Sequence, residues 1–186
     1  MIEITTEAIV LDKEDLGEYD SRVFLYTKEF GRIAAKATSL RKITSKIAGH
    51  LEPLNYVTAR LISRGDYFSG RGFQLADALL IQTKALESDL NILREQLRIA
   101  QFLKLTIPDN GFDMELWSFL RSLNQHSGQS VKMQDMLKIL GFDLQFASCE
   151  LFSKERPEYF YPKNNFFVCQ FCSLGARDLK ENLLLI

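Results

Sequence analysis

The chain has 186 residues, of which 46% are apolar and 25% are charged, and its formal net charge is −1. A chain of this length and composition can bury a core, which excludes a disordered polymer and predicts one or two small domains. With only two histidines, the chain has few candidates for a histidine-based active site. An odd number of cysteines excludes a disulfide framework that uses all of them.

The cellular compartment follows from the N-terminal residues and the cysteines. The start, MIEITTEAIVL, lacks the basic residues of a signal peptide. No apolar run reaches the ~20 residues of a membrane span. Three cysteines clustered late in the chain fit a reducing compartment. We therefore expect a cytoplasmic protein with no membrane partner.

The residues up to Gln74 have the pattern of short strands. β-Branched and aromatic residues alternate with polar ones between turn signals, which predicts strands at residues 4–11, 22–27, 32–38, 56–63 and 67–74. Short strands with one longer polar connection fit a small closed or nearly closed antiparallel β-barrel, of which the oligonucleotide-binding (OB) fold is one form. The predicted class is α+β, with an OB-fold domain at residues 1–76.

Beyond residue 75 the apolar period becomes helical. Leucines spaced by three, four and seven residues from Leu79 to Leu97 predict a long helix that ends before the turn at 108–111. A second helix is expected from the N-cap Asp113 to a break at 126–128, and a third from Ser130 to Gly141. These stripes are best explained as core packing. Residues 77–186 are expected to form a helical domain.

Charge is strongly segregated along the first 64 residues. Residues 22–64 contain nine lysines and arginines and two acids, a balance of +7, whereas residues 1–21 have a balance of −6. A concentrated positive surface suits a polyanion such as nucleic acid, because each neutralised phosphate releases counterions. The alternative is a solvated basic face with no ligand.

Strand parity indicates where these charges point. On the strand at 32–38, Arg32 and Lys36 share the face opposite Ile33. On the strand at 56–63, Tyr56 and Arg60 share a face, a combination that grips single strands by stacking and phosphate contact. Tyr26 is a second stacking candidate. The candidate DNA contacts are Arg22, Arg32, Lys36, Arg41, Lys42, Lys46, Tyr56, Arg60 and Arg64.

Four fragments in order carry a family resemblance. They are GEYD at 17–20, FLYT at 24–27, GRIAAKA at 31–37 and RKITSKIAGHLEP at 41–53. Their order and spacing, with Ser45, Gly49 and Pro53 in the last, resemble the N-terminal domain of the RecO family of recombination mediators. Thr38-Ser39 departs from the glycine usual there, which affects only the local turn.

The resemblance implies a function and a set of partners. A RecO-like protein is expected to bind single- and double-stranded DNA, anneal complementary strands, and help RecA displace single-strand-binding protein, together with RecR. The helical domain is expected to bind the acidic, apolar C-terminal tail of single-strand-binding protein. Residence in the bacterial cytoplasm at the nucleoid follows from the same resemblance.

The C-terminal cysteines lie where many RecO members carry two zinc-binding Cys-x-x-Cys pairs. Here Cys169 and Cys172 form the second pair, whereas Phe152 stands where the partner of Cys149 would be. A structural zinc site needs four ligands, and neither histidine has the required spacing. Zinc is therefore the candidate cofactor, on three ligands, and the alternative is a degenerate knuckle at about 147–174 packed by phenylalanines. Further helices usual in the family are expected to be missing, as in a C-terminally reduced short form.

Catalytic motifs are not found in the sequence. His50 and His126 belong to no nucleophile, metal or acid–base pattern, and the turn Gly70-Arg71-Gly72 lacks the Lys-Ser/Thr of a phosphate-binding loop. We therefore expect a protein that is not an enzyme. The rival to the DNA-binding mediator is a non-catalytic adaptor whose barrel docks an acidic protein partner, with DNA contact incidental.

Overall fold

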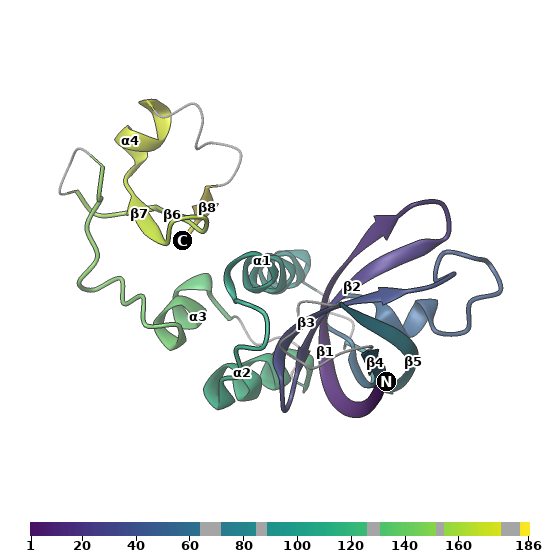
Figure 1. Ribbon diagram of the computed structural model, residues 1–186. Coiled ribbons are helices and arrows are strands. Elements are labelled where there is room, and N and C mark those ends of the chain that lie inside the picture. The colour runs from purple at the N-terminus through teal and green to yellow at the C-terminus, as the bar shows by residue number, and fades with distance from the viewer. Residues whose placement is uncertain (64–71, 85–88, 126–130, 152–154, 176–182) are drawn as a thin grey trace. The chain divides into compact units, whose positions relative to one another are not determined.

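The structure, a computed structural model, describes residues 1–63, 72–84, 89–125, 131–151, 155–175 and 183–186 (Figure 1). It divides into two compact units, residues 1–129 and residues 130–186. Within the described ranges, no helix is both long enough and apolar enough to cross a membrane.

The first unit begins with a five-stranded barrel. Its strands are β1 (Ile2–Leu16), β2 (Asp20–Thr27), β3 (Gly31–Ala37), β4 (Tyr56–Ser63) and β5 (Phe73–Gln82). They pair in the order β1-β2-β3-β5-β4, and β4 pairs back with β1. Every pairing is antiparallel except that of β3 with β5. The mixed α+β class and the N-terminal five-stranded sheet are confirmed, and the antiparallel prediction is corrected at this one parallel pair.

β1 is longer than predicted because it pairs with two other strands. Its first half, from Ile2 to Ile9, pairs with β4, and its second half, from Ala8 to Leu16, pairs with β2. The register of the pairing with β2 shifts between Val10 and Asp12, just after the last pair of β1 with β4 at Ile9. Such an irregularity bends a strand and lets it continue around a barrel.

Alternating side chains fill the barrel. On β3, Ile33, Ala35 and Ala37 are at most 1% exposed, whereas Lys36 is exposed. The predicted parity of this strand is therefore confirmed. The small alanines on β3 and the larger side chains of the other strands make one apolar cluster: Ala8, Val10, Val23, Leu25, Ile33, Ala35, Ala37, Leu40, Leu51, Val57, Ala59, Leu61, Phe73, Leu75 and Ala78.

The fifth strand and the start of the first helix differ from the prediction. β5 begins at Phe73 and runs to Gln82, so the expected boundary at residues 76 and 77 falls inside a strand. Leu79, read as the start of a helical stripe, pairs instead with Thr58 of β4. A short apolar run cannot be assigned to strand or helix by periodicity alone, and the pairing with β4 decides this one.

Two helices complete the first unit. The helix α1 (Leu90–Thr106) is capped by Asp89, whose side chain accepts a hydrogen bond from the amide of Asn91 at 2.8 Å. The helix α2 (Met114–Gln125) is capped by Asp113, as predicted, through the amide of Leu116 at 2.8 Å. Figure 1 shows α1 and α2 beside the barrel, and α1 contacts β1.

A close approach fixes this helical pair to the barrel. Gly31, at the start of β3, has φ +67° and lies against the carbonyl of Gly111 in the α1–α2 connection. A Cβ at residue 31 would overlap that carbonyl, so only glycine allows the contact. The amide of Asn110 also donates to the carbonyl of Arg32 at 2.9 Å.

The second unit is not wholly helical, which corrects the prediction for residues 77–186. It contains α3 (Met133–Ile139), β6 (Tyr159–Tyr161), β7 (Phe166–Val168), α4 (Gln170–Gly175) and β8 (Leu184–Leu185). The strands form a small sheet in the order β7-β6-β8. Phe160 packs edge-on against Phe142 and Phe167, with ring centroids 5.0 and 5.1 Å away, so two of the phenylalanines expected in the knuckle are in contact.

Candidate nucleic-acid interface

The helices cover one half of the outer face of β2 and β3. Tyr26 is fully buried there, its ring stacked 6.5 Å from Trp117. Its hydroxyl donates to the carbonyl of Asp113 at 3.2 Å and accepts from the Asp113 amide at 2.9 Å. Burial raises the pKa of Tyr26. The proposal that Tyr26 stacks on a base is therefore wrong, because the helical pair occupies its ring.

Tyr56 is buried in the same way. It is 5% exposed, 6.3 Å from the ring of Trp117, and the Arg121 guanidinium lies 3.6 Å from its ring centroid. Burial and a hydrogen bond to Glu7 raise the pKa of Tyr56 to about 12. The predicted stacking role of Tyr56 is corrected for the same reason: a cation and a tryptophan from α2 already cover the ring.

Arg32 also lies beneath the helices. Its side chain is 15% exposed, forms an ion pair with Asp109, and lies 5.5 Å from the ring centroid of Phe24. Lys104 of α1 lies 4.7 Å from the same ring. Arg32 thus holds the α1–α2 connection and is only slightly accessible to a ligand.

The other half of the β2–β3 face is open to solvent. Arg22 and Lys36 lie opposite each other in the register and both are exposed. Lys36 pairs with Asp20 at 2.7 Å, whereas Arg22 makes no ion pair within the described part of the chain. This pair of cations continues into the connection that follows β3.

The connection from 38 to 47 folds against the β1–β2 hairpin. The Arg41 amide donates to the carbonyl of Tyr19 at 3.0 Å, and its guanidinium contacts the carbonyl of Gly17 at 3.1 Å and Asp15 at 3.3 Å. The Ser39 amide donates to Asp20 at 2.8 Å. The structure thus brings basic side chains from β2, β3 and the loop to one end of the barrel. We call this surface the basic tip; it consists of Tyr19, Arg22, Lys36, Arg41, Lys42, Ile43 and Lys46.

Two members of the basic tip were missed by the sequence analysis. Tyr19 is 46% exposed and the Lys42 ammonium lies 5.3 Å from its ring centroid, while Ile43 is fully exposed. Both lie in turns, where strand parity gives no orientation. The position of Tyr19 in the β1–β2 hairpin was the available signal, because that loop binds ligands in OB-folds.

Arg60 lies elsewhere on the barrel. It is on β4, which is separated from β2 by β1 and from β3 by β5. Its guanidinium pairs with Glu3 at 3.1 Å. The predicted single basic face is therefore corrected to two regions. Arg64, the neighbouring candidate, lies outside the described residues.

Most acidic residues of the N-terminal segment form ion pairs with basic residues in the folded unit. Ion pairs join acids at residues 3–20 to bases elsewhere in the unit: Glu3–Arg60, Glu7–Lys28, Asp12–Lys104, Glu14–Lys104, Asp15–Arg41 and Asp20–Lys36. The exposed pairs among them, such as Asp15–Arg41 and Asp20–Lys36, contribute only about 0–1 kcal/mol each, so a phosphate can replace the carboxylate there. Arg22, Lys42 and Lys46 are exposed and make no ion pair among the described residues.

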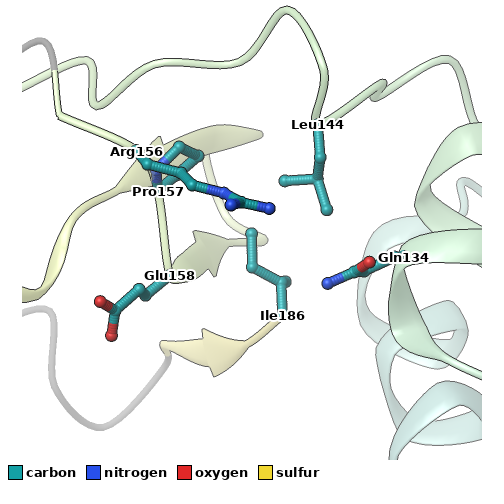
Figure 2. Close-up of a pocket in the computed structure, with 6 residues that line it drawn as sticks. All are labelled: Gln134, Leu144, Arg156, Pro157, Glu158 and Ile186. Atoms are coloured by element: carbon teal, nitrogen blue, oxygen red, sulfur yellow. The ribbon is translucent and has the colours of Figure 1, made fainter.

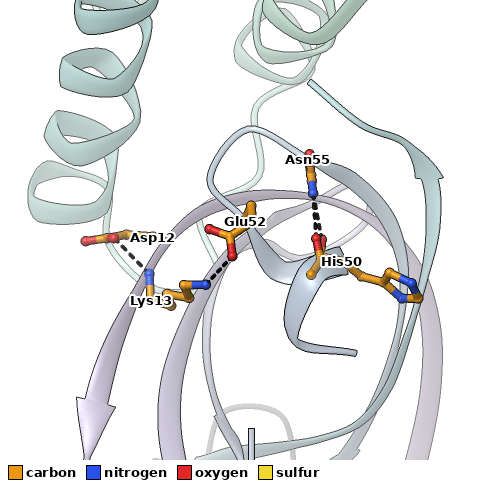
Figure 3. A network of polar contacts seen from close by, with 6 residues as sticks. Asp12, Lys13, His50, Glu52 and Asn55 are labelled. Atoms are coloured by element: carbon orange, nitrogen blue, oxygen red, sulfur yellow. Dashed lines mark hydrogen bonds and ion pairs between the residues drawn. The ribbon is translucent and has the colours of Figure 1, made fainter. Parts of the chain in front are cut away.

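The second half of the connection between β3 and β4 is anchored to the barrel through the short helix η1 (Ala48–Leu51) (Figure 3). Lys13 pairs with Glu52 at 2.7 Å, and the side-chain Nδ2 of Asn55 donates to the carbonyl of His50 at 3.2 Å. The His50 ring lies 2.7 Å from the carbonyl of Ala78. His50 is therefore a polar residue of the connection, as expected, and its ring contacts the backbone of β5.

The three cysteines of the second unit converge. Their sulfur atoms lie within 4.8 Å of one another, all three residues are buried, and no disulfide joins them. Burial raises the pKa of Cys149, but hydrogen bonds from the backbone of Cys169 and Leu151 outweigh it, and the pKa falls to about 6. The Cys172 amide also points at the Cys169 sulfur, 3.4 Å away. This donor set fits a soft divalent metal through three thiolates. Phe152 and His126 lie outside the described residues.

Each unit also contains a hollow in its surface. The second unit has one of about 320 Å³, lined by Gln134, Leu144, Arg156, Pro157, Glu158 and Ile186. Figure 2 shows Arg156 and Gln134 pointing toward Ile186 and Glu158 pointing away. On α1, a shallow groove of about 380 Å³ is lined by Leu90, Leu93, Arg94, Leu97, Arg98 and Gln101. Leu90 is 72% exposed there, which makes the groove apolar with basic edges.

Known proteins resemble this chain in two ways. Residues 1–69 match the family model described as recombination protein O N terminal. Over 91% of its length the chain is 28% identical to the DNA repair protein RecO of Thermodesulfovibrio yellowstonii, covering 70% of that protein. The Myxococcus xanthus protein of the same name is 27% identical over 92% of the chain, covering 73% of that protein.

A shorter stretch gives higher identity. The DNA repair protein RecO of Streptomyces avermitilis is 39% identical over 69 residues, which is 37% of this chain and 28% of that protein. Higher identity is thus confined to a stretch about as long as the part that the family model matches, and lower identity extends over most of the chain. Residues 1–69 thus match the RecO N-terminal family model, and the resemblance of the chain to the RecO family is confirmed.

Proposed function

We infer that this protein acts in DNA repair and recombination by binding nucleic-acid phosphates at the basic tip. The observation that carries this inference is that Arg22 and Lys42, exposed and without ion pairs to described residues, lie at the end of the barrel that bears Tyr19, within the part that matches the RecO N-terminal family model; Lys46 is exposed in the same connection as Lys42. The OB-fold uses this end, through its first hairpin loop and strands 2 and 3, to bind oligonucleotides. Phosphate contacts of this kind are independent of base sequence.

The finer activity is that of a recombination mediator. The protein binds single- and double-stranded DNA, anneals complementary strands, and assists the loading of RecA onto single strands coated with single-strand-binding protein, together with RecR in the bacterial cytoplasm. None of these steps needs covalent chemistry, because a basic surface screens the repulsion between two phosphate backbones and raises the local concentration of strands. The resemblance to RecO supports this assignment.

The groove on α1 is the candidate site for the tail of single-strand-binding protein. Leu90 and Leu97 offer exposed apolar surface, and Arg94 is exposed at the edge of the groove. An acidic, apolar peptide would match both features. The site lies on a different element from the basic tip, so the peptide and DNA should bind independently.

The test of DNA binding is fluorescence anisotropy of a labelled single strand against salt, with two unrelated base sequences. We expect Arg41→Ala with Lys42→Ala to weaken binding to both sequences alike and to lower the salt slope by about 1 to 2. The matched control is Lys28→Ala with Arg60→Ala, which removes the same charge away from the basic tip. Absence of binding at low salt, or equal losses in the two double variants, would reject the basic tip as the DNA site.

The adaptor remains the second candidate, and the ion pairs favour it. Asp15 and Asp20 already place carboxylates on Arg41 and Lys36, so an acidic protein segment could replace them. A titration with the tail peptide, repeated with DNA as competitor, separates the two functions. Independent binding supports the mediator, and competition for one site supports the adaptor.

The proposed cofactor is zinc, held by Cys149, Cys169 and Cys172. Its role would be structural, because a bound metal would cross-link β7, α4 and the segment before β6, a connection that in small units substitutes for core size. Elemental analysis of protein purified without chelator, with Cys169→Ser as the comparison, tests this proposal. One zinc per chain that is lost in the variant is the expected result, and metal-free protein with an unchanged fold would favour the degenerate knuckle.

A further inference from the structure

We propose that the basic tip holds an unpaired nucleobase against the ring of Tyr19, with Ile43 as an apolar neighbour, and so prefers single strands to duplex. This inference rests on the proposed function and names the ligand of the same surface. Tyr19 is the exposed ring among the described aromatic residues of the barrel strands and hairpins, since Phe24, Tyr26, Tyr56 and Phe73 are buried and Phe30 is half-buried against the barrel core. Aromatic stacking on bases is the usual way in which OB-folds hold single strands.

The position of Tyr19 is fixed by the loop beneath it. Its carbonyl accepts the Arg41 amide at 3.0 Å, and Asp20, the next residue, accepts the Ser39 amide at 2.8 Å. Within the loop, the Ser45 amide donates to the carbonyl of Lys42 at 2.8 Å. The hydroxyl of Tyr19 is hydrogen-bonded to Glu18. The backbone that carries the ring and the loop is therefore preorganised, so little ordering of the loop is required when a strand binds.

The positive charges near Tyr19 are placed where the phosphate backbone of a bound strand would pass the ring. Lys42 lies beside the ring, 5.3 Å from its centroid, and is exposed. Arg22 and Lys36 continue from this point along β2 and β3. A base on Tyr19 would thus have cations available for the phosphates on either side of it. Ile43, fully exposed next to Lys42, adds apolar surface that a phosphate would not use.

Stacking on Tyr19 distinguishes single strands from duplex. The bases of a duplex are already stacked and paired, so their faces are closed to a side chain on the protein surface. The cations of the basic tip contact phosphates of either form. Loss of the ring should therefore affect one ligand only, whereas loss of a cation should affect both.

The test compares Tyr19→Ala, Tyr19→Phe and Leu79→Ala in the full chain. Leu79 is 61% exposed on β5, away from the basic tip, and its truncation controls for loss of exposed apolar surface. The affinities for a 15-nucleotide single strand and for a duplex of the same length are measured by anisotropy. A strand carrying 2-aminopurine reports stacking by fluorescence quenching.

We expect Tyr19→Ala to weaken single-strand binding about tenfold, with the duplex affinity and the salt slope unchanged and the quenching lost. Tyr19→Phe and Leu79→Ala should bind as the wild type does. Wild-type affinity and quenching in Tyr19→Ala would overturn the stacking site while leaving the phosphate surface intact. Failure of the unmodified protein to bind either DNA would overturn the proposed function and this inference together.

Discussion

The two ends of the β2–β3 face carry similar residues in different surroundings. At the end near Gly31, Tyr26 and Arg32 lie beneath the helical pair, where the tyrosine hydroxyl and the guanidinium contact residues of the α1–α2 connection. At the end near Gly17, Tyr19 and Lys36 face solvent. An aromatic ring beside a cation is therefore a core contact at one end of the face and a candidate ligand contact at the other. What differs is the presence of a helix over the strands.

The largest expected effect comes from the two glycines that mark these ends. Gly31→Ala should destabilise the first unit by roughly 3 kcal/mol, because the added Cβ meets the Gly111 carbonyl and φ is positive. Gly17→Ala, with φ +72° and open space, should cost about 1 kcal/mol from backbone strain alone. Urea unfolding of both variants checks the difference.

Gly49→Ala is the control for these two variants. Gly49 has open space around its Cα and does not have positive φ, so no loss of stability is expected there. Equal destabilisation by Gly31→Ala and Gly17→Ala would show that the helical pair does not press on the barrel at Gly31.

The second comparison exchanges the two tyrosines for phenylalanine. Tyr26→Phe removes a hydroxyl that bridges both backbone groups of Asp113 and should cost about 1–3 kcal/mol of unfolding free energy. Tyr19→Phe removes an exposed hydroxyl whose hydrogen bond is with the neighbouring exposed residue Glu18, and it should cost less than about 0.5 kcal/mol. Thermal unfolding of the two single variants is sufficient. Similar losses would contradict the assignment of one ring to the core and the other to the surface.

The smallest effect concerns the pH dependence of the open end. A hydrogen bond from Lys36, with one from the Ser39 amide, lowers the pKa of Asp20 from its ordinary value of 3.8. A lowered folded-state pKa means that this stabilisation is present above pH 3.8 and is lost as the pH falls through the folded-state value. Stability measured from pH 5 downward should therefore fall less steeply in Asp20→Asn than in the wild type.

Salt provides the control for this pH effect. The Asp20–Lys36 pair is exposed, so 1 M NaCl should reduce the difference between the variant and the wild type. A difference that is insensitive to salt would mean that the backbone hydrogen bond to Ser39, rather than the ion pair, controls the titration.

The sequence predicted those features of the fold that depend on local pattern. The outward direction of Lys36, the N-cap Asp113 and the extent of β4 all follow from periodicity or capping, and the structure confirms them. The length of β5 and the strands of the second unit were not predicted, because pairing between distant segments decides them. Leu79 lies in a strand only because β4 is beside it.

The candidate site was predicted less completely, for the same physical reason. Residue type and parity identified Lys36 and Arg41, but they do not show which strands a helix will cover. Tyr26 and Tyr56 were chosen as stacking residues, and both lie beneath α2. Tyr19 was overlooked because turns have no parity. A sequence can thus indicate that a surface binds polyanions without indicating which ring lies within reach.

The ion pairs of β1 and the hairpin that follows it have a kinetic consequence. A phosphate that reaches Lys36 or Arg41 must take the place of Asp20 or Asp15, so binding exchanges one anion for another. Those carboxylates stay within a few ångströms of the cations and can reclaim them as soon as a phosphate moves away. On the proposed function, the protein thus carries its own competitor for the phosphates at Lys36 and Arg41, and we expect a bound strand to exchange rapidly there.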